Sequence, residues 1–190
     1  MTSDEPEEQV SGAWCQVPGK SRDDRRVMSD ESTNAHQSSF PCHWSLVTGH
    51  CSLITRSPEE TVNFGRELAK EVQPPCLVLL EGELGSGKTT LVKGIVASLA
   101  SVPEDEVTSP SFTLVHEFGP EGRVYHVDLY RVEGARDLAT LGLDDLLGRD
   151  ATVLIEWGEK FGEEIPRPSV RIRIEHLGGD ERRITVERLT

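Results

Sequence analysis

A glycine-rich segment between an apolar run and a helical pattern constrains the fold of this chain more than any other feature. Residues 82–89 read Gly-Glu-Leu-Gly-Ser-Gly-Lys-Thr, which fits the pattern G-x-x-x-x-G-K-[ST]. The run Cys76–Leu80 before it has the length and composition of a strand that is covered on both faces. After it, apolar residues recur at helical spacing as far as Pro103. A strand, a glycine-rich loop and a helix in this order predict an α/β domain that binds phosphate.

The residue types in this loop explain why it suits phosphate. Gly82, Gly85 and Gly87 allow backbone angles that turn successive N–H groups inward, which makes a concave site for an anion. The helix that follows adds its dipole and its free N–H groups. Lys88 can reach the β- and γ-phosphates as a point charge, and the Thr89 hydroxyl can ligate magnesium. We therefore predict ATP and Mg²⁺ as ligands, with nucleotide contacts from Gly82, Glu83, Leu84, Gly85, Ser86, Gly87, Lys88, Thr89 and Thr90.

A phosphate-binding loop needs companions that hold magnesium and orient water. Two carboxylates end apolar runs, where α/β sheets place their ligands: Asp128 follows Tyr125-His126-Val127, and Glu156 follows Val153-Leu154-Ile155. The segment 108–113 carries four hydroxyls around a proline and suits a switch loop. The alternatives are strand-end carboxylates that face solvent and an ordinary turn that enters a strand.

The other patterns predict a mixed, mainly parallel sheet that is flanked by helices and ends in an antiparallel hairpin. Ser57, Pro58 and Glu60 are typical of a helix start, with Ser57 as the N-cap and Glu60 completing a capping box. Gly178-Gly179-Asp180 is typical of a hairpin turn. Together these elements predict one P-loop ATPase domain over residues 52–190. The predicted strands are 76–80, 112–118, 124–129, 151–156, 170–175 and 183–188, and helices are predicted after Ser57, after the loop and over 135–147.

Residues 1–51 differ from the rest of the chain. They are rich in Ser, Asp, Glu, Gln, Pro and Asn and show no sustained period of 2 or 3.6, so we predict a disordered N-terminal extension. Met28 is an alternative start site. Another alternative is a zinc site in this segment, although the spacing matches no usual structural zinc pattern. Its candidate ligands are His36, Cys42, His43, His50 and Cys51.

Charge and cysteine content limit the partners and the compartment. The chain has 20 Lys and Arg residues against 33 Asp and Glu, and the net charge of −13 disfavours a broad basic surface for nucleic acid. No run reaches the roughly 18 apolar residues of a membrane-spanning helix, and the acidic N-terminus lacks the features of an export signal. The four cysteines include no C-x-x-C pair. We therefore expect a cytoplasmic protein without membrane contact.

Four motifs taken together resemble the TsaE (YjeE) family. They are the loop Gly82–Thr90, the block Thr108–Val115, the block His126-Val127-Asp128-Leu129-Tyr130-Arg131 and the block Ile155-Glu156-Trp157. The order and spacing of the four agree with the family, and the likeness extends over roughly residues 54–190. The resemblance implies a bacterial ATPase that acts with the TsaB–TsaD pair and TsaC in making threonylcarbamoyladenosine in tRNA. Contact with tRNA would then be indirect, through the complex.

The resemblance also implies roles for individual residues. In the family, the P-loop threonine and the glutamate before the tryptophan hold magnesium, and these correspond to Thr89 and Glu156. The aspartate of the H-x-D block corresponds to Asp128 and is needed near the γ-phosphate, so the predicted catalytic residues are Asp128 and Lys88. The block 109–112 lines the nucleotide region as a switch, which makes Ser109 a further predicted nucleotide contact.

Departures from the family leave the required groups in place. Ser111 replaces a common threonine and keeps the hydroxyl, Ser86 stands where alanine is common, and Gly158 stands where proline often follows the tryptophan. Trp157 lies near the site in the family, although a lone tryptophan more often belongs to a core.

Three functions are compatible with these motifs. The first is a magnesium-dependent ATPase with a low intrinsic rate, since the chain has no obvious dedicated arginine finger; Arg131 could serve in cis or be an ordinary surface arginine. The second is a small-metabolite kinase, which would need a lid or substrate subdomain that the roughly one hundred residues after Thr89 hardly allow. The third is an assembly switch in which bound ATP orders the 108–113 loop and turnover is incidental.

Overall fold

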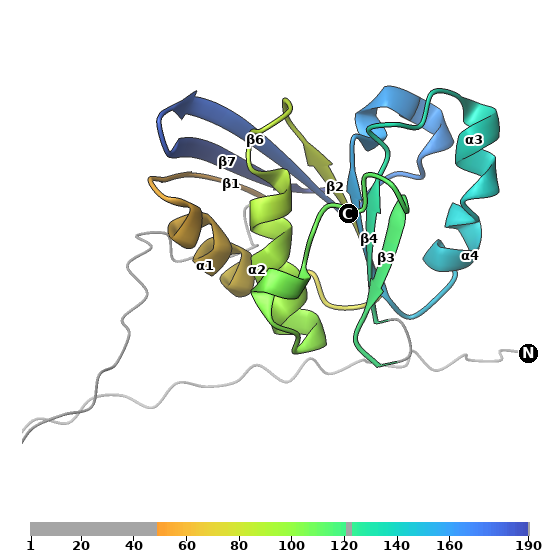
Figure 1. Ribbon diagram of the computed structural model, residues 1–190, viewed down its shortest axis with the longest axis horizontal. Coiled ribbons are helices and arrows are strands. Elements are labelled where there is room, and N and C mark those ends of the chain that lie inside the picture. Colours follow the sequence, from red (N-terminus) through yellow and green to blue (C-terminus); the bar gives the residue numbers. More distant parts are fainter. Residues whose placement is uncertain (1–48, 121–122, 190) are drawn as a thin grey trace, which may run out of the picture. The chain divides into compact units, whose positions relative to one another are not determined.

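The computed structural model describes residues 49–120 and 123–189 (Figure 1). The predicted extension, residues 1–51, lies outside the described residues except for its last three positions. Of these, His50 and Cys51 belong to the first strand, where they pair with Glu187 and Val186. The first strand therefore begins two residues before the predicted domain boundary at residue 52.

The two alternatives given for the extension, a start site at Met28 and a zinc site, concern mostly residues outside the described ranges. Met28 and the candidate zinc ligands His36, Cys42 and His43 all lie there.

One sheet of seven strands runs through the described residues, in the order β1-β7-β6-β2-β5-β4-β3. The central strands β6, β2, β5 and β4 pair in parallel. Antiparallel strands lie at both edges, β7 and β1 on one side and β3 on the other. This arrangement confirms the predicted mixed sheet, and β6 with β7 forms the predicted C-terminal hairpin. The strands are β1 (His50–Thr55), β2 (Cys76–Glu81), β3 (Val115–Phe118), β4 (Val124–Asp128), β5 (Thr152–Glu156), β6 (Val170–Gly178) and β7 (Glu181–Arg188).

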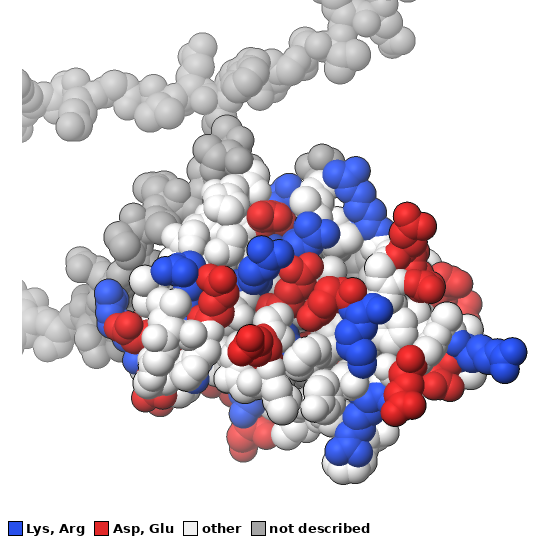
Figure 2. Space-filling view, turned by 90° about the horizontal axis from the view of Figure 1, so that it is seen from above, with Lys and Arg blue, Asp and Glu red and all other residues white. Residues whose placement is uncertain are grey.

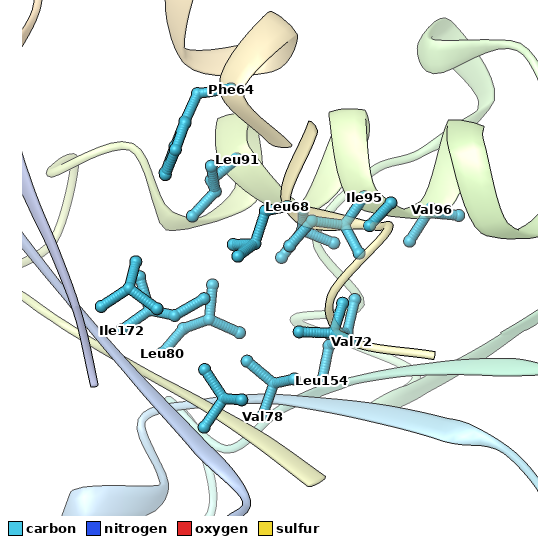
Figure 3. Packing of buried hydrophobic residues seen from close by; sticks show 14 of the residues in the cluster. Phe64, Leu68, Val72, Val78, Leu80, Leu91, Ile95, Val96, Leu154 and Ile172 are labelled. Carbon is cyan, nitrogen blue, oxygen red and sulfur yellow. The ribbon is translucent and has the colours of Figure 1, made fainter. Parts of the chain in front are cut away.

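Helices cover both faces of the sheet (Figure 1). Because side chains alternate along a strand, Val78 and Leu80 of β2 face one layer, whereas Leu77 and Leu79 face the other. Figure 3 shows the first core, in which helix side chains pack down onto the strands. The first layer is α1 (Pro58–Leu68) and α2 (Lys88–Ala100), followed by the 3-10 turn η2 (Glu104–Glu106); the second is α3 (Ala135–Thr140), α4 (Leu143–Leu147) and the 3-10 segment η3 (Gly158–Glu164).

None of the helices in the described part of the chain combines the length and the apolar character needed to cross a membrane.

The predicted start of α1 is confirmed, with one difference in the capping box. Ser57 is the N-cap, and its hydroxyl accepts a hydrogen bond from the backbone N–H of Glu60 at 3.1 Å. The Glu60 carboxylate accepts from the backbone N–H of Arg56 at 2.7 Å, one residue before the N-cap. The reciprocal bond is thus shifted by one residue, and it still satisfies a backbone donor at the helix entrance.

Two predicted elements were wrong in extent, and backbone conformation explains both differences. The predicted strand 112–118 begins only at Val115, because Leu114 has a φ of +66° and donates its N–H to the Pro110 carbonyl at 2.6 Å. The predicted helix 135–147 breaks into α3 and α4 at Gly142, which has a φ of +62°. Such left-handed backbone interrupts regular structure. The ends of the other predicted strands agree with the structure to within three residues.

Helices α1 and α2 approach each other at two glycines. A Cβ atom at Gly94 would lie 2.0 Å from the carbonyl oxygen of Val62, and one at Gly65 would lie 2.4 Å from that of Leu91. Both distances are far shorter than a van der Waals contact, so a side chain at either position would push the helices apart. Since α2 begins at the glycine-rich loop, the close packing of α1 against α2 also fixes the position of the loop.

We expect Gly94→Ala to lower the free energy of unfolding by about 1–3 kcal/mol, the usual range for an overpacked core. The higher helix propensity of alanine, worth about 1 kcal/mol, offsets only part of this loss. Urea denaturation measures the difference. Gly134→Ala is the matched control, because Gly134 has an extended φ of −153° and no atom within 4 Å of the added Cβ. Equal stability of the two variants would contradict the close helix contact.

Candidate functional site

Three segments meet at the carboxyl ends of neighbouring parallel strands. The loop 82–87 follows β2, Glu156 ends β5 and Asp128 ends β4. In the register of the sheet, Glu156 pairs with Leu80 on one side and with Asp128 on the other. Because these strands end together, the loop and both carboxylates border one cleft of about 340 Å³. Its lining residues are Leu84, Gly85, Gly87, Lys88, Thr89, Thr90, Ser109, Ser111, Asp128, Tyr130, Glu156 and Trp157.

Glycines determine the path of the loop. Gly82 has a φ of +148°, and a Cβ atom there would lie 2.4 Å from the carbonyl oxygen of Ile174 in β6. Gly85 and Gly87 have φ values of +78° and +107°, a region that glycine adopts far more readily than other residues. Gly87 is also the N-cap of α2, so the unpaired N–H groups of the first helical turn lie at the loop. Such a loop at a helix N-terminus is suited to an anion.

Lys88 is buried and folds back over the loop. Its Nζ donates to the carbonyl oxygens of Gly82 at 2.7 Å and Glu83 at 3.0 Å. The same atom lies 3.9 Å from the centre of the Trp157 ring, within the range of a cation–π contact. The loop and the tryptophan therefore hold the ammonium group at the cleft, with backbone carbonyls as its acceptors.

Carboxylates around Lys88 oppose the effect of its burial. Burial lowers the pKa of the Lys88 ammonium, whereas Glu156, Glu159 and Asp128 act to raise it. Asp128 and Glu156 are each only 3% exposed, so two buried carboxylates stand beside one buried cation. Two carboxylates close together repel phosphate oxygens, and a divalent cation between the groups removes this repulsion.

Glu156 receives two hydrogen bonds on one oxygen atom. Its Oε1 accepts from the Thr89 hydroxyl at 2.9 Å and lies 2.9 Å from Nε2 of His126. Since a carboxylate can only accept, we assign the hydrogen of the His126 ring to Nε2. Neither of these bonds uses Oε2. The carboxylate is thus fixed at the cleft with one oxygen left for a further ligand.

Asp128 ties the 108–113 loop to the sheet. Its Oδ2 accepts from the hydroxyls of Ser109 at 2.5 Å and Ser111 at 3.0 Å, and these two hydroxyls lie 2.6 Å apart. Its Oδ1 accepts from the backbone N–H of Tyr130 at 3.0 Å. Three donors therefore compensate the burial of this carboxylate, and two of them belong to the loop.

The oxygen atoms at the cleft fit magnesium. This ion prefers oxygen ligands and usually takes one or two carboxylates together with phosphate oxygens and water. Thr89 and Glu156 supply a hydroxyl and a carboxylate within 2.9 Å of each other. No cluster of three or more His, Cys, Asp or Glu side chains suited to a metal occurs among the described residues. The site therefore suits a metal that binds together with a nucleotide better than one held by the protein alone.

Nine of the twelve site residues predicted from the sequence line the cleft, whereas Gly82, Glu83 and Ser86 do not. Gly82 and Glu83 offer their carbonyls to Lys88, and Ser86 is buried, with an Oγ that has no hydrogen-bond partner among the described residues. Arg131 stacks on the ring of Phe112, with the guanidinium carbon 4.2 Å from the ring centre. The nine predicted residues that line the cleft are Leu84, Gly85, Gly87, Lys88, Thr89, Thr90, Ser109, Asp128 and Glu156.

Sequence reasoning assigned no role to two residues that contact this site. His126 lies two residues before Asp128, so strand alternation could have placed it on the same face. Arg182 of β7 packs against the loop from outside, with Nε 3.2 Å from the position of a Cβ atom at Gly87. Nothing local in the sequence indicates the Arg182 contact, because it depends on how the hairpin lies beside the loop.

Comparison with known proteins agrees with these motifs. The family described as "Threonylcarbamoyl adenosine biosynthesis protein TsaE" matches residues 55–184. Proteins named "tRNA threonylcarbamoyladenosine biosynthesis protein TsaE" are similar over most of their length. The one from Bacillus subtilis is 37% identical over 133 residues, which cover 69% of this chain and 81% of the relative. The one from Treponema pallidum is 32% identical over 133 residues, covering 70% and 97%.

A solved structure shows the same fold. The crystal structure of Bacillus subtilis YdiB aligns with a TM-score of 0.59 and 31% sequence identity, covering 74% of this chain and 86% of that one. The likeness includes the P-loop arrangement of a parallel sheet centre flanked by helices.

We expect replacement of both Ser109 and Ser111 by alanine to release the 108–113 loop from Asp128. A hydrogen bond to a charged group contributes about 1.5–3 kcal/mol, so amide exchange of residues 109–114 should rise roughly tenfold or more. Mass spectrometry of hydrogen–deuterium exchange measures this rate. Each single variant should show a smaller rise, because the remaining hydroxyl still donates to Oδ2.

Ser98→Ala serves as the control, because Ser98 is an exposed residue of α2 that does not line the cleft. Unchanged protection of the loop in the double variant would mean that these hydroxyls do not hold it.

Proposed function

The chain belongs to the TsaE family, whose members serve threonylcarbamoyladenosine biosynthesis, and on this premise we propose a magnesium-dependent ATPase that supports the TsaB–TsaD pair. One observation carries the proposal: Lys88, Thr89, Glu156 and Asp128 come from three separate segments and border a single cleft. A lysine, a hydroxyl and two carboxylates beside a glycine-rich loop are the groups that nucleoside triphosphate hydrolysis requires. The transfer of the threonylcarbamoyl group itself would belong to the partners.

Lys88 would change partners when ATP binds. Its ammonium group now donates to the carbonyl oxygens of Gly82 and Glu83. Under the proposal it turns to the β- and γ-phosphate oxygens, so a buried cation keeps acceptors in both states. Little reorganisation is needed, since the group already lies at the cleft.

Thr89 and Glu156 are the proposed magnesium ligands, either directly or through water. Bound magnesium would neutralise phosphate charge and the repulsion between the two carboxylates. Asp128 is the proposed water-orienting residue. As an anion it cannot help to bind phosphate directly, so we expect it to act on the transition state more than on the bound ground state.

The rim of the cleft supports the proposed partner contact. Leu84 and Tyr130 line the cleft and are 72% and 44% exposed, and Phe112, which is 83% exposed, follows the cleft residue Ser111 in the chain. Exposed apolar side chains gathered at one place are typical of a protein-interaction site. A partner that docks there would cover the nucleotide and could supply groups for hydrolysis.

Charge favours an indirect role at tRNA. Seen from above in Figure 2, Lys and Arg side chains alternate with Asp and Glu rather than forming a continuous basic patch. The net charge of −13 also opposes a direct hold on a polyanion. We therefore propose that tRNA is reached through the TsaB–TsaD pair, in the cytoplasm.

A second candidate function is a nucleotide-dependent assembly switch. The observation that favours it is the bond of Ser109 and Ser111 to Asp128, because the loop that they hold also carries the exposed Phe112. A change at the γ-phosphate could then alter the partner surface, with hydrolysis resetting it.

Lys88→Ala should weaken ATP binding by roughly 10- to 150-fold, which corresponds to the loss of about 1.5–3 kcal/mol for a hydrogen bond to a charged group. Calorimetric titration of ATP into the wild-type and variant proteins measures the two Kd values. The surface variant Lys70→Ala is the control, because Lys70 lies after α1 and pairs with Glu67. Unchanged ATP affinity in Lys88→Ala would contradict the assignment of residues 82–89 as a phosphate-binding loop.

The proposed function is tested by ATP hydrolysis with and without purified TsaB–TsaD, together with formation of the modified nucleoside in tRNA. We expect slow turnover alone and faster turnover with the pair. Phe112→Ala should reduce the stimulation severalfold while the basal rate and ATP affinity stay unchanged. Leu177→Ala is the matched control, since Leu177 is an exposed apolar residue of β6 that does not line the cleft.

The proposed function would be overturned by two results together. TsaB–TsaD would leave the rate of ATP hydrolysis unchanged, and tRNA modification would proceed equally well without this chain. Partner binding that changes with nucleotide, without any dependence of modification on turnover, would favour the assembly switch.

A further inference from the structure

His126 lies inside the protein at a place where an apolar residue would be expected. It belongs to the middle of β4, its side chain is fully buried, and it pairs across the sheet with Leu154. Val124 and Leu154 on the same face belong to the core beneath α1 and α2. A leucine or valine here would extend that core, so the choice of an imidazole needs another explanation.

The imidazole meets only part of its hydrogen-bonding capacity. Nε2 lies 2.9 Å from Oε1 of Glu156, whereas Nδ1 is buried without a hydrogen-bond partner among the described residues. A buried polar atom without a partner destabilises the folded state. For stability alone, His126 is therefore a poor residue at this position.

The hydrogen bond that the His126 side chain makes among the described residues is directed at the cleft. Its acceptor, Oε1 of Glu156, also receives the Thr89 hydroxyl at 2.9 Å. Two donors on one oxygen fix both the position and the rotation of the carboxylate, and the second oxygen is left for another ligand. Groups that orient a metal-binding carboxylate in this way commonly affect metal affinity strongly.

We propose that His126 is a positioning residue that holds the Glu156 carboxylate in the orientation needed for magnesium at the nucleotide, an inference that rests on the proposed function. Under this proposal His126 touches neither nucleotide nor metal, and it acts only through Glu156. Thr89 holds the same oxygen from the loop side, so strand β4 and helix α2 share control of one carboxylate.

Three substitutions separate the hydrogen bond from the volume of the side chain. His126→Gln places an N–H donor near the position of Nε2, and His126→Asn places one near the position of Nδ1, too short to reach Glu156. His126→Leu removes the donor and fills the space with an apolar group. The Kd for ATP is measured by calorimetry in excess EDTA and in excess magnesium, and the ratio of the two values gives the contribution of the metal.

In the leucine and asparagine variants, we expect the ratio of the Kd in EDTA to the Kd in magnesium to fall roughly 10- to 100-fold, which is the usual effect of removing such a positioning group. The Kd in EDTA should stay unchanged. The glutamine variant should keep most of the ratio. In a Glu156→Ala background, His126→Leu should have no additional effect. In the Glu156→Ala background, where His126 has no carboxylate to hold, His126→Leu should leave the urea midpoint no lower, which a role in packing alone would not allow.

A second readout needs neither nucleotide nor metal. Long-range ¹H–¹⁵N spectra of the imidazole should show hydrogen on Nε2 in the wild-type protein and a changed tautomer balance in Glu156→Ala. If wild-type ATP binding does not depend on magnesium, the proposed function fails. If wild-type binding does depend on magnesium, two results would contradict the proposed role of His126. One is a full ratio in His126→Leu, and the other is hydrogen on Nδ1 in the spectra.

Discussion

The shared register of three parallel strands is the constraint on which the rest of this site depends. Strands β2, β5 and β4 pair so that Leu80, Glu156 and Asp128 lie at one level of the sheet. Alternation then turns both carboxylates toward the face that α2 covers, and α2 begins at the end of the loop after β2. A shift of β4 by one residue would turn Asp128 and His126 to the opposite face. The cleft is thus a consequence of sheet register more than of any single contact.

Charge compensation governs how this cleft can work. Two carboxylates and one lysine are buried together, and each has acceptors or donors from the protein: Asp128 from serine hydroxyls, Glu156 from Thr89 and His126, and Lys88 from loop carbonyls. These bonds allow charged groups to stay buried before a ligand arrives. Under the proposed function, phosphate and magnesium would replace part of these bonds.

The sequence predicted the features that depend on local spacing. The glycine-rich loop, the helix start at Ser57 and the apolar runs identified the fold class and six of the seven strands, but not β1, and Asp128 and Glu156 were found because each ends such a run. Features that arise from tertiary contact were missed. Leu114 interrupts a predicted strand because its turn is held by the Pro110 carbonyl and by the bonds of the loop to Asp128. The contact of Arg182 with the loop likewise depends on the placement of the hairpin.

Asp128 has two roles under the proposed function: it holds the 108–113 loop and it orients the attacking water. Its Oδ2 accepts from both serine hydroxyls of the 108–113 loop, and its Oδ1 accepts from the backbone of Tyr130. An oxygen with two donors has little capacity left to accept from an attacking water. Oδ1 has a single donor and can accept a second, so under the proposed function the attacking water is oriented at Oδ1 while the serines stay bound to Oδ2. The loop that carries Phe112 and the attacking water would then be held by one carboxylate, so a partner that contacts Phe112 could change turnover by moving this loop without reaching the phosphates.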